Sequence, residues 1–397
     1  MTRDRVAVVD RARLVGSARV RDGFYSTFVV RRLSRHLTYL ALRLGLRPNE
    51  VTVISMALGI GAALLFARGD WGTTVIAALL LQVSLMVDCV DGEVARYTGR
   101  FTPVGAWLDG VGDRVKEYSV YAGLAAGYDV WAMAAAMLVV QVFRHHVDFG
   151  FAAEPHAAAG PTTALPTTLA VDGAMLGRRA VALSESTSAR PALMWAKRVV
   201  IMPIGERWLV ISVASVIGGG RLVFWVLLVS CSVALLYTTT GRVLRALARS
   251  RSPLDPHQLS VMTALLPPPL EELPAALTRQ RLGGIVPAKV RAGELAAVLA
   301  VAAHQHAALL PLAYALAAVI AVDGYDVVYR LRQAQDEPAT WRKVALLGAL
   351  PRLAVVLTVL LTLGDGRRGA LAVLAAAFAL VCAAEISTWL RRAGSTS

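Results

Sequence analysis

Residues 87–113 read VDCVDGEVARYTGRFTPVGAWLDGVGD, and the four aspartates of this stretch stand inside strongly apolar sequence. Asp88 and Asp91 are spaced i, i+3, so they share one face of a helix. Asp109 and Asp113 are spaced i, i+4 and also share a face. Acidic side chains within membrane segments are costly and generally mark a functional site. Two neighbouring helices would therefore direct four carboxylates into a common space.

Four carboxylates at close range need cations between them. Hard divalent ions that prefer oxygen ligands, such as Mg²⁺ or Mn²⁺, fit this requirement. The competing interpretation is a set of acids at helix ends that face water. It leaves Gly92, Arg96 and Gly105, which stand among the aspartates, without a purpose.

The composition indicates an integral membrane protein. Of the 397 residues, 56% are hydrophobic and 17% are charged, below the roughly 25% charged residues usual in soluble domains. The net charge is +14, but the arginines flank apolar runs, which is typical of the positive-inside rule and of anionic lipid headgroups. We therefore expect membrane lipids and no nucleic acid as partners. The three cysteines are far apart and predict no disulfide framework, and the N-terminus lacks the pattern of a signal peptide.

The apolar pattern predicts an all-α membrane protein built on a six-helix transmembrane bundle. Residues 1–20 are expected to be flexible, and residues 21–46 to form an amphipathic helix at the membrane interface. With six crossings, every basic flank lies on the side of the aspartates, which predicts that the site faces the cytoplasm. The expected location is a bacterial cell membrane. The expected spans are about 51–67, 72–96, 105–125, 130–146, 206–219 and 221–241.

A second membrane module is expected after a proline-containing linker. The predicted division is 1–20, 21–248 (the bundle with its interfacial helix), 249–290 (linker) and 291–397 (module). The apolar runs at 293–303 and 308–322 meet at His304-Gln305-His306, where a hairpin with solvated histidines is favoured over one long tilted helix or a metal site. Asp323 and Asp326 are expected to close a helix at the membrane surface.

The spacing of the first stretch resembles the signature of the class I CDP-alcohol phosphatidyltransferase family. Eight fixed residues read Asp88-x2-Asp91-Gly92-x2-Ala95-Arg96-x8-Gly105-x3-Asp109-x3-Asp113. The sequence around these eight residues is most similar to that of di-myo-inositol phosphate phosphate synthases and phosphatidylinositol phosphate synthases. The resemblance covers about residues 20–248 and leaves the last 150 residues without a function.

The resemblance implies transfer of a substituted phosphate group from a CDP-linked alcohol to the hydroxyl of an acceptor alcohol, with release of CMP. The donor would be CDP-diacylglycerol or a CDP-polyol, and the acceptor a polyol phosphate such as inositol phosphate. Asp88, Asp91, Asp109 and Asp113 would hold two Mg²⁺ or Mn²⁺ ions, and Asp113 would also take the acceptor proton as catalytic base. The resemblance leaves a homodimer open. The residues that it assigns to CDP are Asn49, Thr52, Gly92, Ala95, Arg96, Thr102 and Gly105.

A purely structural role is open to some of these residues. Glycine and alanine also serve tight helix packing in membranes, and an arginine at a membrane edge can snorkel. Residues 48–52 can be interpreted as a proline-broken turn with a helix cap. Candidates for the acceptor phosphate are Arg207, Arg198, Lys197 and Lys116, for which flanking charge is the alternative.

Two other classes of protein remain as alternatives to the transferase. An intramembrane prenyltransferase also binds a diphosphate through aspartates, but it has two similar acidic boxes, and the second is missing from this sequence. A divalent-cation transporter would use acids in a bundle, but the Gly92-x2-Ala95-Arg96 element would then have no purpose. Release of CMP from a CDP-alcohol separates both from the first hypothesis.

Overall fold

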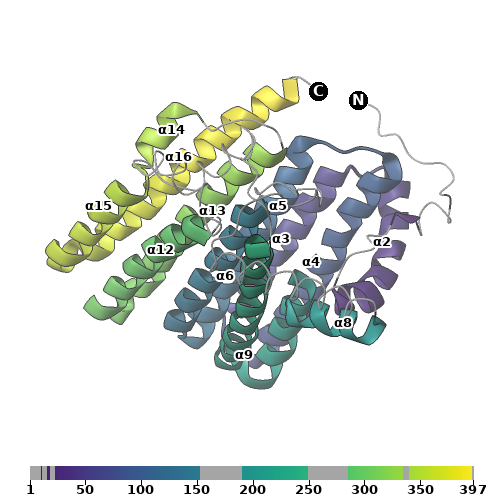
Figure 1. The fold of residues 1–397 in the computed structure, drawn as a ribbon, viewed down its shortest axis with the longest axis horizontal. Coiled ribbons are helices and arrows are strands. Elements are labelled where there is room, and N and C mark those ends of the chain that lie inside the picture. Colours follow the sequence, from purple (N-terminus) through teal and green to yellow (C-terminus); the bar gives the residue numbers. More distant parts are fainter. Residues whose placement is uncertain are drawn as a thin grey trace, which may run out of the picture.

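The computed structural model describes residues 10, 16–17, 23–152, 190–248, 285–333 and 339–395. All regular structure in these ranges is helical, which confirms the predicted all-α class. Most of the predicted linker, 249–290, and the predicted flexible N-terminus lie outside the described residues. Figure 1 shows the N-terminal bundle on one side and the C-terminal helices beside it.

Turn chemistry sets the ends of the bundle helices. Pro48 occupies the first turn of its helix, where the missing N–H costs nothing. Asp70 caps the next helix by accepting from the Thr73 N–H at 2.9 Å, and the Thr73 hydroxyl hydrogen bond lowers the pKa of Asp70 below its ordinary value. The left-handed Gly99 ends that helix. The helices are α2 (Arg31–Leu44, after a π-helical turn at Ser26–Val30), α3 (Pro48–Phe66), α4 (Trp71–Thr98), α5 (Pro103–Tyr128), α6 (Trp131–Ala152), α8 (Pro191–Val200) and α9 (Ile204–Ala248).

Helix α9 contains a reversal of the chain at Gly218 and Gly219, whose backbone angles are not helical. Arg207, near the start of α9, donates a hydrogen bond to the carbonyl oxygen of Met202. The same oxygen accepts a hydrogen bond from Arg144 of α6. Arg242, near its end, pairs with Asp148 of the same α6. Both ends of α9 therefore lie beside the end of α6, and the predicted turn near residue 219 is present.

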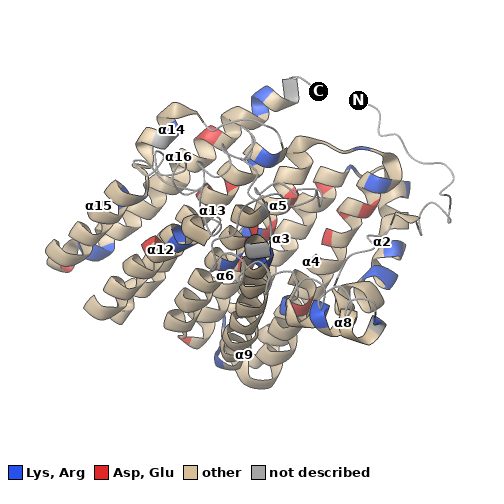
Figure 2. Cartoon of the chain, viewed as in Figure 1, with Lys and Arg blue, Asp and Glu red and all other residues tan. Residues whose placement is uncertain are grey.

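Helix α2 exposes its apolar side and buries its polar side. Leu33, Leu40 and Leu44 are about half exposed, whereas Ser34 and Thr38 are fully buried. Basic side chains also gather on α2 and around α8 (Figure 2). An apolar face turned outward, with basic residues around it, is the arrangement expected of a helix at a membrane interface.

The C-terminal helices pack directly on the bundle. They are α12 (Val286–Gln305), α13 (Leu310–Gln333), α14 (Thr340–Ala345), α15 (Ala349–Thr362) and α16 (Arg367–Ser395). Helix α12 packs against α6, and α13 packs against α5 (Figure 1). One hydrophobic core runs through both parts, from Ala62 and Leu124 of the bundle to Leu316 and Ile320 of α13.

The hairpin predicted at His304-Gln305-His306 is confirmed. Helix α12 ends at Gln305, and His306 is extended and accepts a hydrogen bond from the Ala308 N–H. The expectation for Asp323 and Asp326 is wrong, because both lie inside α13, which continues to Gln333, and both are buried. Their charges are met by Arg330 and Arg342 of the same part of the chain.

The protein has the helices of a multi-pass membrane protein. Within the described ranges, five helices are long and apolar enough to cross a membrane, by length and composition: Pro48–Phe66, Trp71–Thr98, Ile204–Ala246, Ala307–Gln333 and Gly364–Ala393. Helices α5 and α6 are not among them. Helix α5 carries Asp109, Asp113, Arg114, Lys116 and Glu117, which are bundle-facing charges that lower its hydropathy.

Candidate active site

Three carboxylates meet where the end of α4 faces the start of α5. Asp88, Asp91 and Asp109 each offer an oxygen, and these oxygens all lie within 4.8 Å of one another. Asp91 is buried and Asp109 is exposed, so the cluster is reachable from one side. Carboxylate oxygens are the ligands that Mg²⁺ and Mn²⁺ prefer, and the donor set therefore fits a divalent cation.

Helix α3 orients two of these carboxylates through hydroxyl groups. The Thr52 hydroxyl donates to Asp91 Oδ2 at 2.6 Å. The Ser55 hydroxyl donates to Asp88 Oδ1 at 3.0 Å. Hydrogen bonds of this kind fix the direction of a metal ligand. Thr52, assigned to CDP by the sequence pattern, thus contacts an aspartate directly.

Asp113 lies one turn deeper, where Lys116 joins the cluster. Lys116 Nζ lies 3.0 Å from Asp113 Oδ1, pairs with Asp88 Oδ1 and donates to the Ser55 hydroxyl at 3.0 Å. Its side chain is 1% exposed. Gly59 of α3 makes room for its stem, because a Cβ there would lie 3.1 Å from Lys116 Cγ. The structure therefore places Lys116 between the aspartates as a built-in cation.

A cavity of about 450 Å³, here called the aspartate pocket, opens beside the cluster. Six of the seven residues assigned to CDP line it, together with Asp91 and Asp109. Ala95 is the exception. Gly105 has a clear steric reason, because a Cβ there would lie 2.7 Å from Asn49 Oδ1. The lining residues from that set are Asn49, Thr52, Gly92, Arg96, Thr102 and Gly105.

A second and larger cavity of about 780 Å³, here called the basic cavity, lies among α6, α8 and α9. Four basic residues line it: Arg144, Lys197, Arg242 and Arg245. Asp148 also lines it and pairs with Arg242 at 2.6 Å. Of the residues predicted for an acceptor phosphate, only Lys197 lies on this wall. Arg198 stacks on the Trp195 ring at 4.6 Å instead.

Arg207 belongs to a buried polar network centred on Glu117, a residue that the sequence pattern did not single out. Glu117 accepts from Arg207 Nε at 2.8 Å and from Arg114 at 2.8 Å. Tyr121 and Gln141 each donate to Glu117 at 2.7 Å. Arg207 is 2% exposed and is not among the residues that line the basic cavity. Glu117 follows Asp113 by four residues and therefore lies on the same face of the helix. This spacing is the feature of the sequence that could have identified Glu117.

The chain is similar to known proteins in two separate segments. Residues 46–203 match the family described as CDP-alcohol phosphatidyltransferase, and residues 273–396 match a family of unknown function, DUF5941. The bifunctional IPC transferase and DIPP synthase of Aquifex aeolicus is 37% identical over 107 residues, which are 27% of this chain and 24% of that protein. The phosphatidylinositol phosphate synthase of Mycolicibacterium smegmatis is 38% identical over 118 residues, 28% of this chain and 51% of that protein.

An archaeal protein is also similar to this chain over a segment of about the same length. The archaetidylinositol phosphate synthase of Pyrococcus horikoshii is 32% identical over 84 residues, which are 21% of this chain and 43% of that protein. The chain thus spans about half or less of the length of these curated relatives.

Proposed function

We propose that the protein transfers a substituted phosphate group from a CDP-linked alcohol to the hydroxyl of a polyol phosphate, because residues 46–203 match the CDP-alcohol phosphatidyltransferase family. One observation carries this proposal. Three carboxylates from two helices converge within 4.8 Å beside a pocket lined by Asn49, Arg96 and Thr102. The inositol phosphate chemistry in the names of the relatives supports a polyol phosphate as acceptor.

Asp88, Asp91 and Asp109 would hold Mg²⁺ or Mn²⁺, with Asp113 as a fourth carboxylate of the same cluster. A divalent cation held there would supply positive charge to the diphosphate of the donor and to the leaving group. Thr52 and Ser55 keep the carboxylates in place. The nucleotide lies along Asn49, Thr102 and Arg96, and Arg96 offers its charge to a phosphate.

Asp113 takes the proton of the acceptor hydroxyl. The hydroxyl oxygen forms a bond to the β-phosphorus of the donor, and the bond from that phosphorus to the CMP oxygen breaks. CMP leaves with the electron pair. The ion pair with Lys116, at 3.0 Å, keeps the Asp113 carboxylate oriented while it accepts the proton.

The basic cavity supplies the acceptor site. Arg144, Lys197, Arg242 and Arg245 surround a volume large enough for a phosphorylated polyol. Clustered arginines bind phosphate through paired hydrogen bonds. Arg207 acts indirectly, through Glu117, and holds the start of α9 against α5.

The aspartate pocket faces the cytoplasm. It opens at the end of the bundle that carries Arg43, Arg47, Arg96 and Arg100, whereas the opposite turn between α3 and α4 carries one arginine, Arg68. Basic residues concentrate on the cytoplasmic side of membrane proteins. CTP-derived donors are made on that side as well.

The test measures CMP release by the full chain in liposomes containing CDP-diacylglycerol, with inositol phosphate and Mg²⁺. Asp113→Asn should lower the rate by roughly 10²- to 10⁴-fold, the usual contribution of a general base. Asp70→Asn is the matched control, because Asp70 is a helix cap at the other end of α4 and its rate should not change.

An Asp113→Asn variant that releases CMP at the wild-type rate would overturn the assignment of the base. No release from CDP-diacylglycerol or from soluble CDP-polyols, together with Mn²⁺ uptake into the liposomes, would replace the proposal by cation transport.

A further inference from the structure

A residue from outside the phosphatidyltransferase domain lines the aspartate pocket. Gln333, the last residue of α13, is exposed and shares the wall of this pocket with Asn49, Thr102 and Asp109. It lies in the 273–396 segment that matches a family of unknown function. The pocket is thus formed jointly by the two segments of the chain.

The face of α13 that carries Gln333 is the face that packs on α5. Asp326, Tyr329 and Gln333 are spaced i, i+3 and i+7, so they lie on one side of the helix. Trp107 Nε1 of α5 donates to Asp326 Oδ1 at 2.7 Å. The Tyr329 ring lies against Gly110, where a Cβ would be 2.5 Å from Tyr329 Cε1. Both α5 contacts flank Asp109, so α13 is fixed next to a carboxylate of the cluster.

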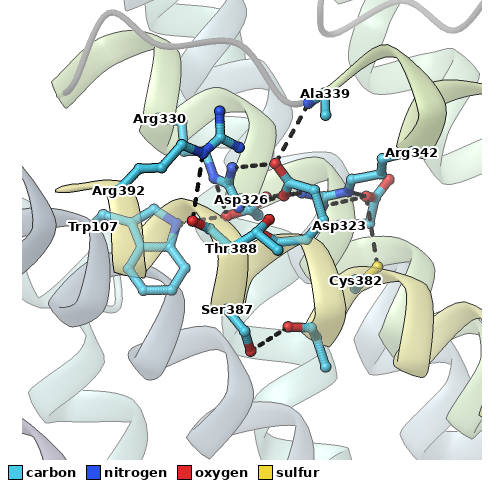
Figure 3. A network of polar contacts seen from close by, with 12 residues as sticks. Trp107, Asp323, Asp326, Arg330, Ala339, Arg342, Cys382, Ser387, Thr388 and Arg392 are labelled. Atoms are coloured by element: carbon cyan, nitrogen blue, oxygen red, sulfur yellow. Dashed lines mark hydrogen bonds and ion pairs between the residues drawn. The ribbon is translucent and has the colours of Figure 1, made fainter. Parts of the chain in front are cut away.

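A buried ion network holds this face in place (Figure 3). Arg330 binds both oxygens of Glu385 at 2.9 and 2.7 Å and Asp326 at 2.9 Å. Arg342 binds Asp323 at 2.6 Å and Glu385 at 2.8 Å. The network joins α13, α14 and α16. Buried polar groups that are satisfied in this way fix one arrangement of the helices.

The chemistry of Gln333 suits a nucleoside. Its amide both donates and accepts hydrogen bonds and carries no charge. The carboxylates and Arg96 provide for the charged diphosphate, whereas Asn49, Thr102 and Gln333 are neutral groups of the kind that bind base and ribose edges. We propose that Gln333 hydrogen-bonds the nucleoside of the CDP-linked donor, an inference that rests on the proposed function. Trp107, through Asp326, is its positioning residue.

Binding of CMP to the purified full chain with Mn²⁺ tests the assignment. Gln333→Ala should weaken CMP binding roughly 3- to 10-fold, the loss expected for one neutral hydrogen bond, and should leave Mn²⁺ affinity unchanged. Gln305→Ala is the matched control, because Gln305 lies at the opposite end of the α12–α13 hairpin and bonds Arg367. It should bind CMP as the wild type does.

The outcomes separate the two proposals. Equal CMP binding by the wild type and by Gln333→Ala overturns the role of Gln333 alone. So does a weakening that appears for CDP-diacylglycerol and not for CMP, because Gln333 would then contact the alcohol. A wild-type chain that binds no CMP overturns the proposed function and, with it, this inference.

The positioning role is tested by a double-mutant cycle. Trp107→Phe keeps an aromatic ring beside Trp389, whose centroid is 5.0 Å from that of Trp107, and removes the donor to Asp326 together with part of the buried indole. Asp326 keeps Arg330 and Arg342 as partners, so the variant retains its ion pairs. Trp107→Phe should weaken CMP binding in the wild type and have no further effect in Gln333→Ala. Additive effects, or no effect of Trp107→Phe alone, would overturn the positioning role.

Discussion

Lys116 changes the charge of the acidic cluster before any metal binds. Its ammonium lies between Asp88 and Asp113 and is nearly inaccessible to solvent. Four carboxylates and one ammonium leave a formal charge of −3, so Lys116 offsets part of the repulsion among the acids. It must also compete with a divalent cation for the same oxygens, because an ammonium at hydrogen-bond distance occupies one lone pair of each partner.

Lys116→Met should therefore have opposite effects on metal affinity and on metal-free stability. Mn²⁺ affinity should rise about tenfold or more, since two unit charges about 4 Å apart interact by several kcal/mol even in a polarisable site. In EDTA the variant should unfold at lower temperature, because Asp88 and Asp113 lose their buried partner. Free Mn²⁺ measured by electron paramagnetic resonance and thermal unfolding in detergent give the two readouts.

Lys197→Met is the control for this prediction, since Lys197 lines the basic cavity. Its Mn²⁺ affinity should match the wild type. Weaker Mn²⁺ binding by Lys116→Met would contradict the competition and would mean that Lys116 helps to hold the carboxylates in their metal-binding arrangement.

The reversal within α9 depends on one glycine. Gly219 has φ 65° and ψ −167°, a region that is essentially reserved for glycine. A Cβ there would also lie 2.5 Å from Tyr128 Cε1, and Tyr128 is held by a hydrogen bond to the Thr74 hydroxyl at 2.7 Å. The turn between the two arms therefore combines backbone strain with a close contact to the end of α5.

Gly219→Ala should destabilise the protein by about 1–3 kcal/mol, the usual cost of a non-glycine residue in this region of backbone space. Gly293→Ala is a matched control, because Gly293 lies within α12 and nothing stands within 4 Å of its added Cβ. It should leave stability unchanged or raise it by up to about 1 kcal/mol. The unfolding temperatures of both variants test this prediction. If Gly219→Ala is as stable as Gly293→Ala, the backbone at position 219 does not require glycine.

Helical spacing predicted the parts of the site that one helix carries. Asp88 and Asp91 could be assigned to one face of α4, and Asp109 and Asp113 to one face of α5, from the sequence alone. The contacts of Thr52 with Asp91 and of Lys116 with Asp88 could not be predicted, because they join different helices. Their formation depends on how α3, α4 and α5 pack, which periodicity does not specify.

The packing of the C-terminal helices on the bundle could not be predicted from the sequence for the same reason. Trp107 and Asp326 are 219 positions apart, and nothing in the pattern around either residue indicates the other. Apolar runs predicted where helices α12 and α13 lie along the chain. Their packing on α6 and α5, and the continuous core that results, follow only from the complete fold.

The two segments are expected to unfold together, because they share one core and because the buried ion network borders α5 through Trp107. Arg330→Met leaves Asp326, Asp323 and Glu385 with Arg342 as the remaining network arginine. Stability should fall by about 3–5 kcal/mol, the usual cost of removing one partner of a buried pair. In Arg330→Met/Glu385→Leu the second change removes one of the three carboxylates that Arg342 would otherwise have to neutralise alone, and it should restore part of that loss.

Mn²⁺ reports whether this loss reaches the aspartate pocket. A ligand that binds the folded state raises the unfolding temperature of the whole unit to which it is coupled. Mn²⁺ should therefore shift a single transition in the wild type and in both variants, although its ligands lie on α4 and α5 and the substitutions lie on α13 and α16. A second unfolding transition that does not respond to Mn²⁺, and that is the only one lowered by Arg330→Met, would contradict this expectation. It would mean that the C-terminal helices unfold independently of the bundle, although Gln333 lines the pocket.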